Sequence, residues 1–232
     1  MMKIVVLHGS PRRGNTYKAT EIFMDELSNY GDVEFTEFFF PKALPEFCTG
    51  CQRCMSNGNE ACPHSSFVTP VLDALLGSDA LVFTTPHYGA CSMSAGMKNL
   101  LDHLDFLTMN VFPRAEIFEK KAFIITTGAG STAAIKPIKK FLINWGMNRV
   151  NACGVRMFTD KWDNMPEKKK IGIENRLKNA ANSFYRTKKK SPYLAAIGMY
   201  YMSKFILKKY AGKETNSYKY WEKMGFIRKR PF

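Results

Sequence analysis

Residues 3–16 read KIVVLHGSPRRGNT, and this stretch decides the fold that the sequence predicts. The run Lys3–Leu7 is short and almost wholly apolar, which is typical of a strand that is buried on both faces. Residues 8–16 contain two glycines, a serine and a threonine, and apolar residues recur at helical spacing after Asn15. A loop between a buried strand and a helix can bind phosphate, because the N–H groups at a helix N-terminus have no intrahelical partner. The stretch therefore predicts a phosphate-binding loop at the carboxyl end of a strand.

The alternation of strand and helix continues along the chain. Four more strand-like runs follow, at Val33–Phe40, Ala80–Thr85, Ala122–Thr127 and Val150–Phe158. Helix-like segments follow the strands: one after Asn15, one that Thr69-Pro70 is expected to begin, and others at 93–107, 131–145 and 167–186. This alternation predicts an α/β fold with a doubly wound, flavodoxin-like parallel sheet of five strands in the order 2-1-3-4-5. In such a sheet the ligand lies at the carboxyl ends of the strands.

The side chains of the first loop suit an anion. Ser10, Asn15 and Thr16 supply hydrogen-bond donors, and Arg12 or Arg13 can neutralise negative charge. The glycine spacing is neither GxxxxGKS/T nor GxGxxG, which argues against a nucleoside triphosphate and against a dinucleotide of the Rossmann type. An ordinary strand–helix turn is the alternative to a phosphate site.

Three loops at strand ends resemble those of the NAD(P)H-dependent FMN reductases, which have the flavodoxin-like fold. GSPRRGNT at 9–16 resembles their phosphate loop, TTPHYGACSMSAGMKNLLDHL at 84–104 resembles their second flavin loop, and TTGAGS at 126–131 resembles the third. The resemblance covers about residues 1–155 and implies that FMN binds at these loops. The cofactor-binding residues that it implies are Ser10, Arg12, Asn15, Thr16, Pro86, His87, Tyr88, Gly89, Ala90, Thr127, Gly128, Ala129 and Gly130.

The resemblance also implies an activity. We expect an FMN-dependent oxidoreductase that takes electrons from NADH or NADPH and passes them to a quinone, a free flavin or a redox protein. No side chain is expected to act as a catalytic acid or base, because the flavin itself accepts the hydride. A flavodoxin-like electron carrier that turns over no substrate of its own is the alternative.

Four of the six cysteines lie within residues 47–62, FCTGCQRCMSNGNEAC, in the long crossover between the second and third strands. Cys48, Cys51, Cys54 and Cys62 have the spacing C-x2-C-x2-C-x7-C, and three cysteines spaced in this way can bind one corner of an iron–sulfur cluster. Zinc, with His64 as a further ligand, and metal-free thiols are the alternatives. The motif and its place in the fold resemble those of the iron–sulfur flavoproteins, which implies that these four cysteines bind a 4Fe–4S cluster next to FMN. Cys91 and Cys153 lie in apolar sequence and are expected to pack in the core.

The net charge of +14 is unevenly distributed. Residues 1–155 hold 14 Lys+Arg and 14 Asp+Glu, whereas residues 156–232 hold 20 Lys+Arg and 6 Asp+Glu. We therefore expect an FMN-binding domain over 1–186, with a cysteine-rich insertion at 45–66, and a basic helical C-terminal extension over 187–232. No nucleic-acid-binding motif occurs in the basic part, so a nucleic acid is not an expected partner.

The extension contains PYLAAIGMYYM at 192–202, which is apolar on nearly every side, followed by Lys204, Lys208 and Lys209. A helix of this kind is expected to be buried, either on its own domain or on a second subunit of a homo-oligomer. An acidic redox partner protein and an anionic membrane surface are the other partners we consider. The sequence has neither a signal-peptide core nor a run of ~20 apolar residues, which predicts a cytoplasmic protein without structural disulfides.

Overall fold

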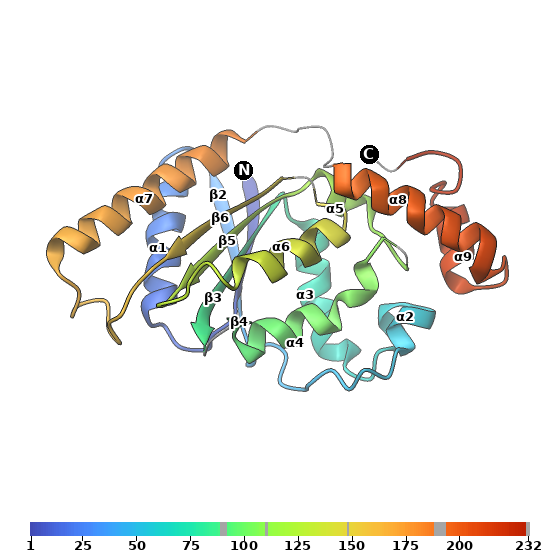
Figure 1. The fold of residues 1–232 in the computed structure, drawn as a ribbon, viewed down its shortest axis with the longest axis horizontal. Helices are drawn as coiled ribbons and strands as arrows, with labels where there is room; N and C mark the ends of the chain where they lie inside the picture. The colour runs from blue at the N-terminus through green and yellow to red at the C-terminus, as the bar shows by residue number, and fades with distance from the viewer. Residues whose placement is uncertain (89–91, 110, 148, 188–193, 231–232) are drawn as a thin grey trace.

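The computed structural model describes residues 1–88, 92–109, 111–147, 149–187 and 194–230. A parallel sheet forms its centre (Figure 1), with the strands in the order β2-β1-β3-β5-β6. The bounds of these strands are Val33–Phe39, Met2–His8, Ala80–Tyr88, Lys121–Thr127 and Arg149–Val155, in the same order. A short sixth strand, β4 at Ser92–Met93, pairs antiparallel with β3. The α/β fold and the predicted order of the five parallel strands are therefore confirmed.

Helices cover both faces of this sheet. On one face lie α1 (Asn15–Ser28) and α7 (Glu167–Arg186), and on the other lie α3 (Ser65–Gly77), α4 (Ala95–His103) and α6 (Ile135–Asn144). Successive residues of a strand point to opposite faces, so each central strand supplies both cores. In β1, Ile4 and Val6 are buried with α1 and α7, whereas Val5 and Leu7 are buried with α3, α4 and α6. Cys153 of β6 is buried beside α1 and α7 as expected, and Cys91 lies outside the described residues.

Several predicted boundaries differ from the structure: the fifth parallel strand ends at Val155 instead of Phe158, and the helix expected over 131–145 begins at Ile135. Two further differences have identifiable reasons. The helix expected to begin at Thr69-Pro70 already begins at Ser65, and Pro70 lies inside it. The N–H groups of Phe67 and Val68 donate to the carbonyl of His64, so the turn after the last cysteine of the motif leads directly into the helix. The third strand extends to Tyr88 instead of Thr85, because β4 folds back on it.

Short helices complete the crossovers. The segment after β2 contains α2 at Arg53–Asn57 and the single turn η1 at Asn59–Ala61. The single turn η2 at Asp105–Leu107 and α5 at Ala115–Glu119 lie between α4 and β5.

The C-terminal part consists of α8 (Leu194–Ile206), a single π-helical turn η3 (Leu207–Ala211) and α9 (Asn216–Lys223). It packs against α5 through a small apolar core that contains Tyr200, Trp221 and Phe226, and the Tyr200 hydroxyl donates to the carbonyl of Phe226 over 2.8 Å. Figure 1 shows α8 at the edge of the molecule, with the strands pointing away from it. None of the helices in the described part of the chain is long and apolar enough to cross a membrane.

Candidate functional site

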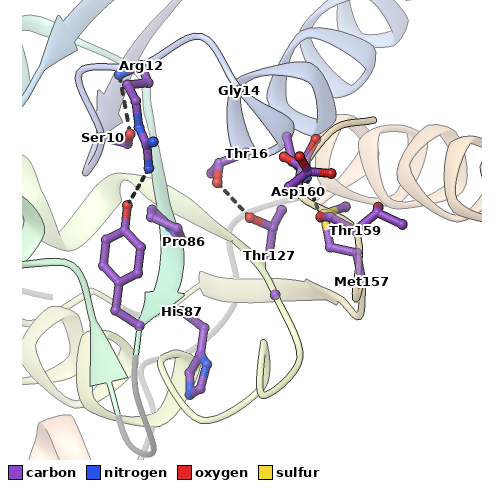
Figure 2. A pocket seen from close by; sticks show the side chains of 13 residues that line it. Ser10, Arg12, Gly14, Thr16, Pro86, His87, Thr127, Met157, Thr159 and Asp160 are labelled. Atoms are coloured by element: carbon purple, nitrogen blue, oxygen red, sulfur yellow. Dashed lines mark hydrogen bonds between the residues drawn. The ribbon is translucent and has the colours of Figure 1, made fainter. Parts of the chain in front are cut away.

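A pocket of about 240 Å³ lies at the carboxyl ends of the parallel strands (Figure 2). Its lining residues come from the loop after β1, the end of β3, and the loops after β5 and β6: Ser10, Arg12, Gly14, Asn15, Thr16, Pro86, His87, Tyr88, Thr127, Gly128, Met157, Thr159 and Asp160. Nine of the thirteen residues predicted to bind the cofactor are among them. Gly89 and Ala90 lie outside the described residues, and Ala129 and Gly130 continue the loop beyond the lining.

The N-terminus of α1 opens into this pocket. Its N-cap is Gly14, no side chain among the described residues caps it, and no acidic residue occurs in its first turn. The first N–H groups of the helix and the positive end of its dipole are therefore available to an anion. Thr16, in this first turn, is buried, and its hydroxyl oxygen lies 2.6 Å from that of Thr127. One hydroxyl donates to the other, so the accepting hydroxyl keeps its own hydrogen for a ligand.

The two arginines of the first loop have different environments. The guanidinium of Arg12 donates to the hydroxyl of Tyr88 over 3.1 Å, across the pocket from β3 (Figure 2). The guanidinium of Arg13 lies over the rings of Tyr17 and Phe39 at 5.1 and 5.8 Å. Arg12 is thus the arginine that faces the pocket.

Asn15 has a role that its place in the loop did not suggest. Its amide donates to the carbonyls of Thr159 and Asp160, over 3.0 and 3.2 Å. It therefore ties the loop after β6 to the start of α1, and this is why Met157, Thr159 and Asp160 line the pocket although the sequence analysis missed them. The rule that ligands lie at the carboxyl ends of strands could have found this loop, because it follows the fifth predicted strand. Hydrogen bonds from Asn164 and from the backbone lower the pKa of Asp160, so its carboxyl stays ionised at the rim.

The glycine-rich loop after β5 packs on His87. Gly128 has a φ of +127°, which favours glycine, and a Cβ atom on Gly130 would lie 2.6 Å from the His87 ring. Figure 2 shows the His87 ring turned away from Thr16 and Thr127 and toward this loop. Its Nε2 atom is buried without a hydrogen-bond partner in the described part of the chain. The loop after β5 thus packs against His87.

The four cysteines of the motif meet at one place. Cys48, Cys51, Cys54 and Cys62 line a cavity of about 20 Å³ together with His64 and His103. All four are free thiols. Burial raises the pKa of the Cys54 thiol, and the charges of Cys62, Cys48 and Cys51 raise it further. An adjoining cavity of about 390 Å³ shares Cys48 and Cys54 with the first.

Helix α4 holds the start of the cysteine motif. The side-chain oxygen of Asn99 accepts from the N–H of Cys48 over 3.0 Å, and its amide donates to the carbonyl of Glu46 over 2.9 Å. Gly50 and Gln52 then adopt positive φ angles of 66° and 58°, which turn the chain back on itself. The bends bring cysteines that are neighbours in sequence around a common centre.

Two histidines adjoin the thiols. Nδ1 of His64 lies 2.9 Å from Nε2 of His103, and Nδ1 of His103 lies 3.0 Å from the carbonyl of Asn99. With Cys62 they offer three ligand atoms within 4.8 Å of one another, which also suits a single metal ion. Burial lowers the pKa of His103, and His64 lowers it further. The sequence suggested His64 as a zinc ligand. It did not suggest His103, because this residue lies 39 residues from His64 in the chain.

Helix α4 also joins the two sites. At its start, the side chain of Ser94 caps the helix and donates to the carbonyl of Gly9 in the first loop. At its end lies His103, in the wall of the cysteine cavity. A rise of ~1.5 Å per residue places the two ends of this helix about 14 Å apart.

Residues 2–157 match the family described as NADPH-dependent FMN reductase, which is more than half of the chain. The chain belongs to the NADPH-dependent FMN reductase family. The loop after β1, the end of β3 and the loop after β5 fall within the matched region, and Thr159 and Asp160 of the loop after β6 lie just beyond it. Proteins of this family are oxidoreductases that use FMN and a reduced nicotinamide.

One relative and several solved structures are similar to this chain. An iron-sulfur flavoprotein of Archaeoglobus fulgidus is 27% identical over 128 residues, which are 55% of this chain and 60% of that protein. An apo NADH:FMN oxidoreductase superposes with a TM-score of 0.56 at 22% identity, over 83% of this chain and 92% of the other. An NAD(P)H:quinone oxidoreductase from Methanothermobacter marburgensis superposes with a TM-score of 0.63 at 14% identity, over 81% and 99%. At these identities the two structures support the fold alone.

Proposed function

We propose that the pocket binds FMN with its phosphate at the N-terminus of α1, and that the cysteine motif binds a 4Fe–4S cluster that links FMN to an electron acceptor. The observation that carries this proposal is the position of α4. One end of this short helix is bonded to the first FMN loop, and the other end borders four free thiols. A redox centre at each end would be close enough to its partner for the two to work together.

The pocket fits the phosphate end of FMN. The uncapped first turn of α1, the hydroxyls of Ser10 and Thr16, and the guanidinium of Arg12 supply donors and positive charge for a dianion. The described lining encloses less than the ~300 Å³ at the lower end of ligand pockets, so it accounts for part of an FMN-sized ligand. Pro86, His87, Tyr88, Gly89 and Ala90 are assigned to the flavin wall, and Thr127, Gly128, Ala129 and Gly130 to the third loop.

The residues of the chain bind and orient, and they supply no acid or base. When bound, FMN supplies hydride acceptance from the nicotinamide and electron release to the next acceptor. Tyr88 holds Arg12 at the mouth of the pocket, and Thr127 holds the hydroxyl of Thr16 at its floor. The proposed acceptor is a quinone, a free flavin or a redox protein.

The chemistry of the thiol cluster favours a bound cation or cluster. Burial raises the pKa of Cys54 most, and the neighbouring thiolates raise it further by repulsion, which a bound iron or zinc ion would reverse. Four thiolates are the usual ligand set of a 4Fe–4S cluster. Such a cluster needs more room than the small cavity offers, and the adjoining larger cavity beside Cys48 and Cys54 provides it. Zinc at Cys62, His64 and His103 with one further thiol is the second candidate, favoured by the spacing of these three ligand atoms.

Metal analysis of protein purified without oxygen tests the proposal. We expect bound FMN, the broad visible absorbance of an iron–sulfur cluster, and about four iron and four sulfide per chain. Cys54→Ser is expected to lose the iron and keep FMN. Cys153→Ala, which removes a buried thiol of β6, is expected to keep both. Stoichiometric zinc, or no metal after anaerobic reconstitution, would contradict the cluster and leave the FMN assignment standing.

A further inference from the structure

The C-terminal helix α8 exposes an apolar face. Its exposed large apolar residues, with those of the following turn, have exposed fractions between 39% and 87%. We call them the α8 outer face: Leu194, Tyr201, Met202, Phe205, Ile206 and Tyr210. The segment was expected to be buried on its own domain or on a second subunit, and within the single chain the fold covers one of its two sides. Tyr193 lies outside the described residues.

The opposite side of the same helix packs against the C-terminal apolar core. Ala196, Tyr200, Ser203 and Leu207 are buried, and they recur at spacings of three and four residues. Phe205 and Met202 follow the same spacing on the other side of the helix, which places them opposite the buried stripe. The helix is thus apolar on two sides, and the fold covers one of them.

Positive charge predominates along this helix and the turn that follows it, and the first acidic residue after them is Glu214, which lies 3.1 Å from the ammonium of Lys219. Residues 194–213 contain Lys204, Lys208, Lys209 and Lys213, and no Asp or Glu. The ammonium of Lys209 lies 5.3 and 5.2 Å from the ring centres of Phe205 and Tyr210, so cations and aromatic rings alternate on the surface.

A groove of about 630 Å³ borders α8 on the side of α6. It runs along one side of α6 and ends at Met199 of α8. Its wall combines apolar Ile135 and Ile143 with lysines of α6, of which Lys136 and Lys140 are exposed. The apolar surface therefore has basic residues on this flank as well.

We propose that the α8 outer face docks on an anionic phospholipid bilayer, with its apolar side chains at the boundary between headgroups and acyl chains and its lysines on the lipid phosphates. The mixture of aromatic, aliphatic and lysine side chains is typical of helices that lie in a membrane interface. The 13 residues of α8 extend ~20 Å, which is shorter than the ~30 Å hydrocarbon core, so the helix lies on the bilayer. Since the strands point away from α8 (Figure 1), this orientation leaves the FMN pocket accessible.

The charges argue against the other occupants. A second copy of the chain seated on this face would bring the two sets of lysines together, with no carboxylate in residues 194–213 to pair with them. An acidic protein would satisfy the lysines and would give no reason for a row of exposed Leu, Met and Phe side chains. An anionic bilayer accepts both the charges and the apolar side chains. The proposal does not depend on the iron–sulfur cluster or on the identity of the electron acceptor.

Vesicle flotation of the full chain tests this proposal. The probes are vesicles of phosphatidylcholine alone and of equal parts phosphatidylcholine and phosphatidylglycerol, each at low and high salt. We expect the protein to float with the anionic vesicles at low salt. It should not float with them at high salt, because salt screens the attraction, and it should not float with the phosphatidylcholine vesicles, which carry no net charge.

Two pairs of matched variants separate charge from burial. Lys208→Gln with Lys209→Gln is expected to weaken binding about 25-fold, since each lysine near an anionic surface strengthens it about fivefold. Met202→Ser with Phe205→Ser is expected to weaken it about tenfold or more. The controls lie on α7, where Ile171→Ser and the pair Lys168→Gln with Lys178→Gln change residues that are just as exposed. They are expected to bind like the wild type.

Four results would overturn the proposal. Failure to float with anionic vesicles at low salt excludes the bilayer, and equal losses in the α7 controls show binding through net charge alone. Unchanged binding of the Met202→Ser, Phe205→Ser variant leaves an electrostatic surface of the kind an acidic protein uses. If sedimentation shows instead that this variant turns a dimer into monomers, a second copy covers the face. All substituted side chains are exposed, and circular dichroism confirms that each variant is folded.

Discussion

Thr16→Val tests the assignment of the phosphate end most directly. Valine keeps the shape of the buried side chain and removes the hydroxyl that lies 2.6 Å from the hydroxyl of Thr127. Loss of a hydrogen bond to a charged phosphate costs about 1.5–3 kcal/mol. The dissociation constant of FMN should therefore rise roughly 10- to 150-fold. The unfolding free energy of the apoprotein should also fall by about 1 kcal/mol, because the variant lacks the buried hydrogen bond to Thr127 whether or not FMN is bound.

Thr20→Val is the matched control. Thr20 lies one turn later on the same helix, is equally buried, and donates its hydroxyl to the carbonyl of Thr16 over 2.8 Å, outside the pocket. Its replacement should also destabilise the protein by about 1 kcal/mol and leave FMN affinity unchanged. Titration of the apoprotein with FMN, followed by flavin fluorescence, gives both affinities, and urea unfolding gives both stabilities. If the two variants bind FMN equally well, the phosphate does not lie at the N-terminus of α1.

Three further predictions concern the surrounding structure. Gly130→Ala should lower both FMN affinity and melting temperature, because its Cβ atom would lie 2.6 Å from the His87 ring. The control Gly172→Ala in α7, where the added Cβ atom meets nothing within 4 Å, should raise the melting temperature, and equal melting temperatures for the two variants would contradict this packing. Asn15→Ala should speed amide hydrogen exchange in the loop after β6 even without FMN, since it removes two hydrogen bonds to that loop, and unchanged exchange would show that the loop is held by other contacts. Burial lowers the pKa of Lys121 to about 8, so between about pH 8 and 10.5 the folded state binds fewer protons than the unfolded state. The unfolding free energy measured in urea should therefore rise with pH over this range, and the Lys121→Met variant should not show this rise.

The arrangement of the loops assigned to FMN follows from local sequence. Buried parallel strands are short apolar runs, and their order follows from the few topologies that an alternating α/β chain can adopt. Since the carboxyl ends of such strands meet at one edge, the sequence alone is enough to assign three loops that are far apart in the chain to one pocket. The strand order and the family were confirmed, and nine of thirteen assigned residues do line one pocket. Their binding of FMN stays a prediction.

The features that sequence missed depend on contacts between distant segments. Asn15 has the chemistry of a phosphate donor, and only the approach of the loop after β6 gives it two carbonyl partners instead. The pairing of His64 with His103 depends on the crossover folding back against α4. Pro70 signals a helix start in local sequence, yet the turn after Cys62 begins the helix earlier.

The sequence by itself determined the α/β alternation, the glycine-rich loop after the first strand, the compact cysteine motif and the concentration of positive charge in the last third, because each is a property of neighbouring residues. It also showed that the segment 192–202 is apolar almost all round. Composition measures how much apolar surface a helix carries, and it does not say how much of that surface the rest of the chain can cover. Only the tertiary structure decided that Tyr200 and Leu207 are buried against the C-terminal core while Tyr201 and Phe205 face outward, because a helix packed on one neighbour buries one side.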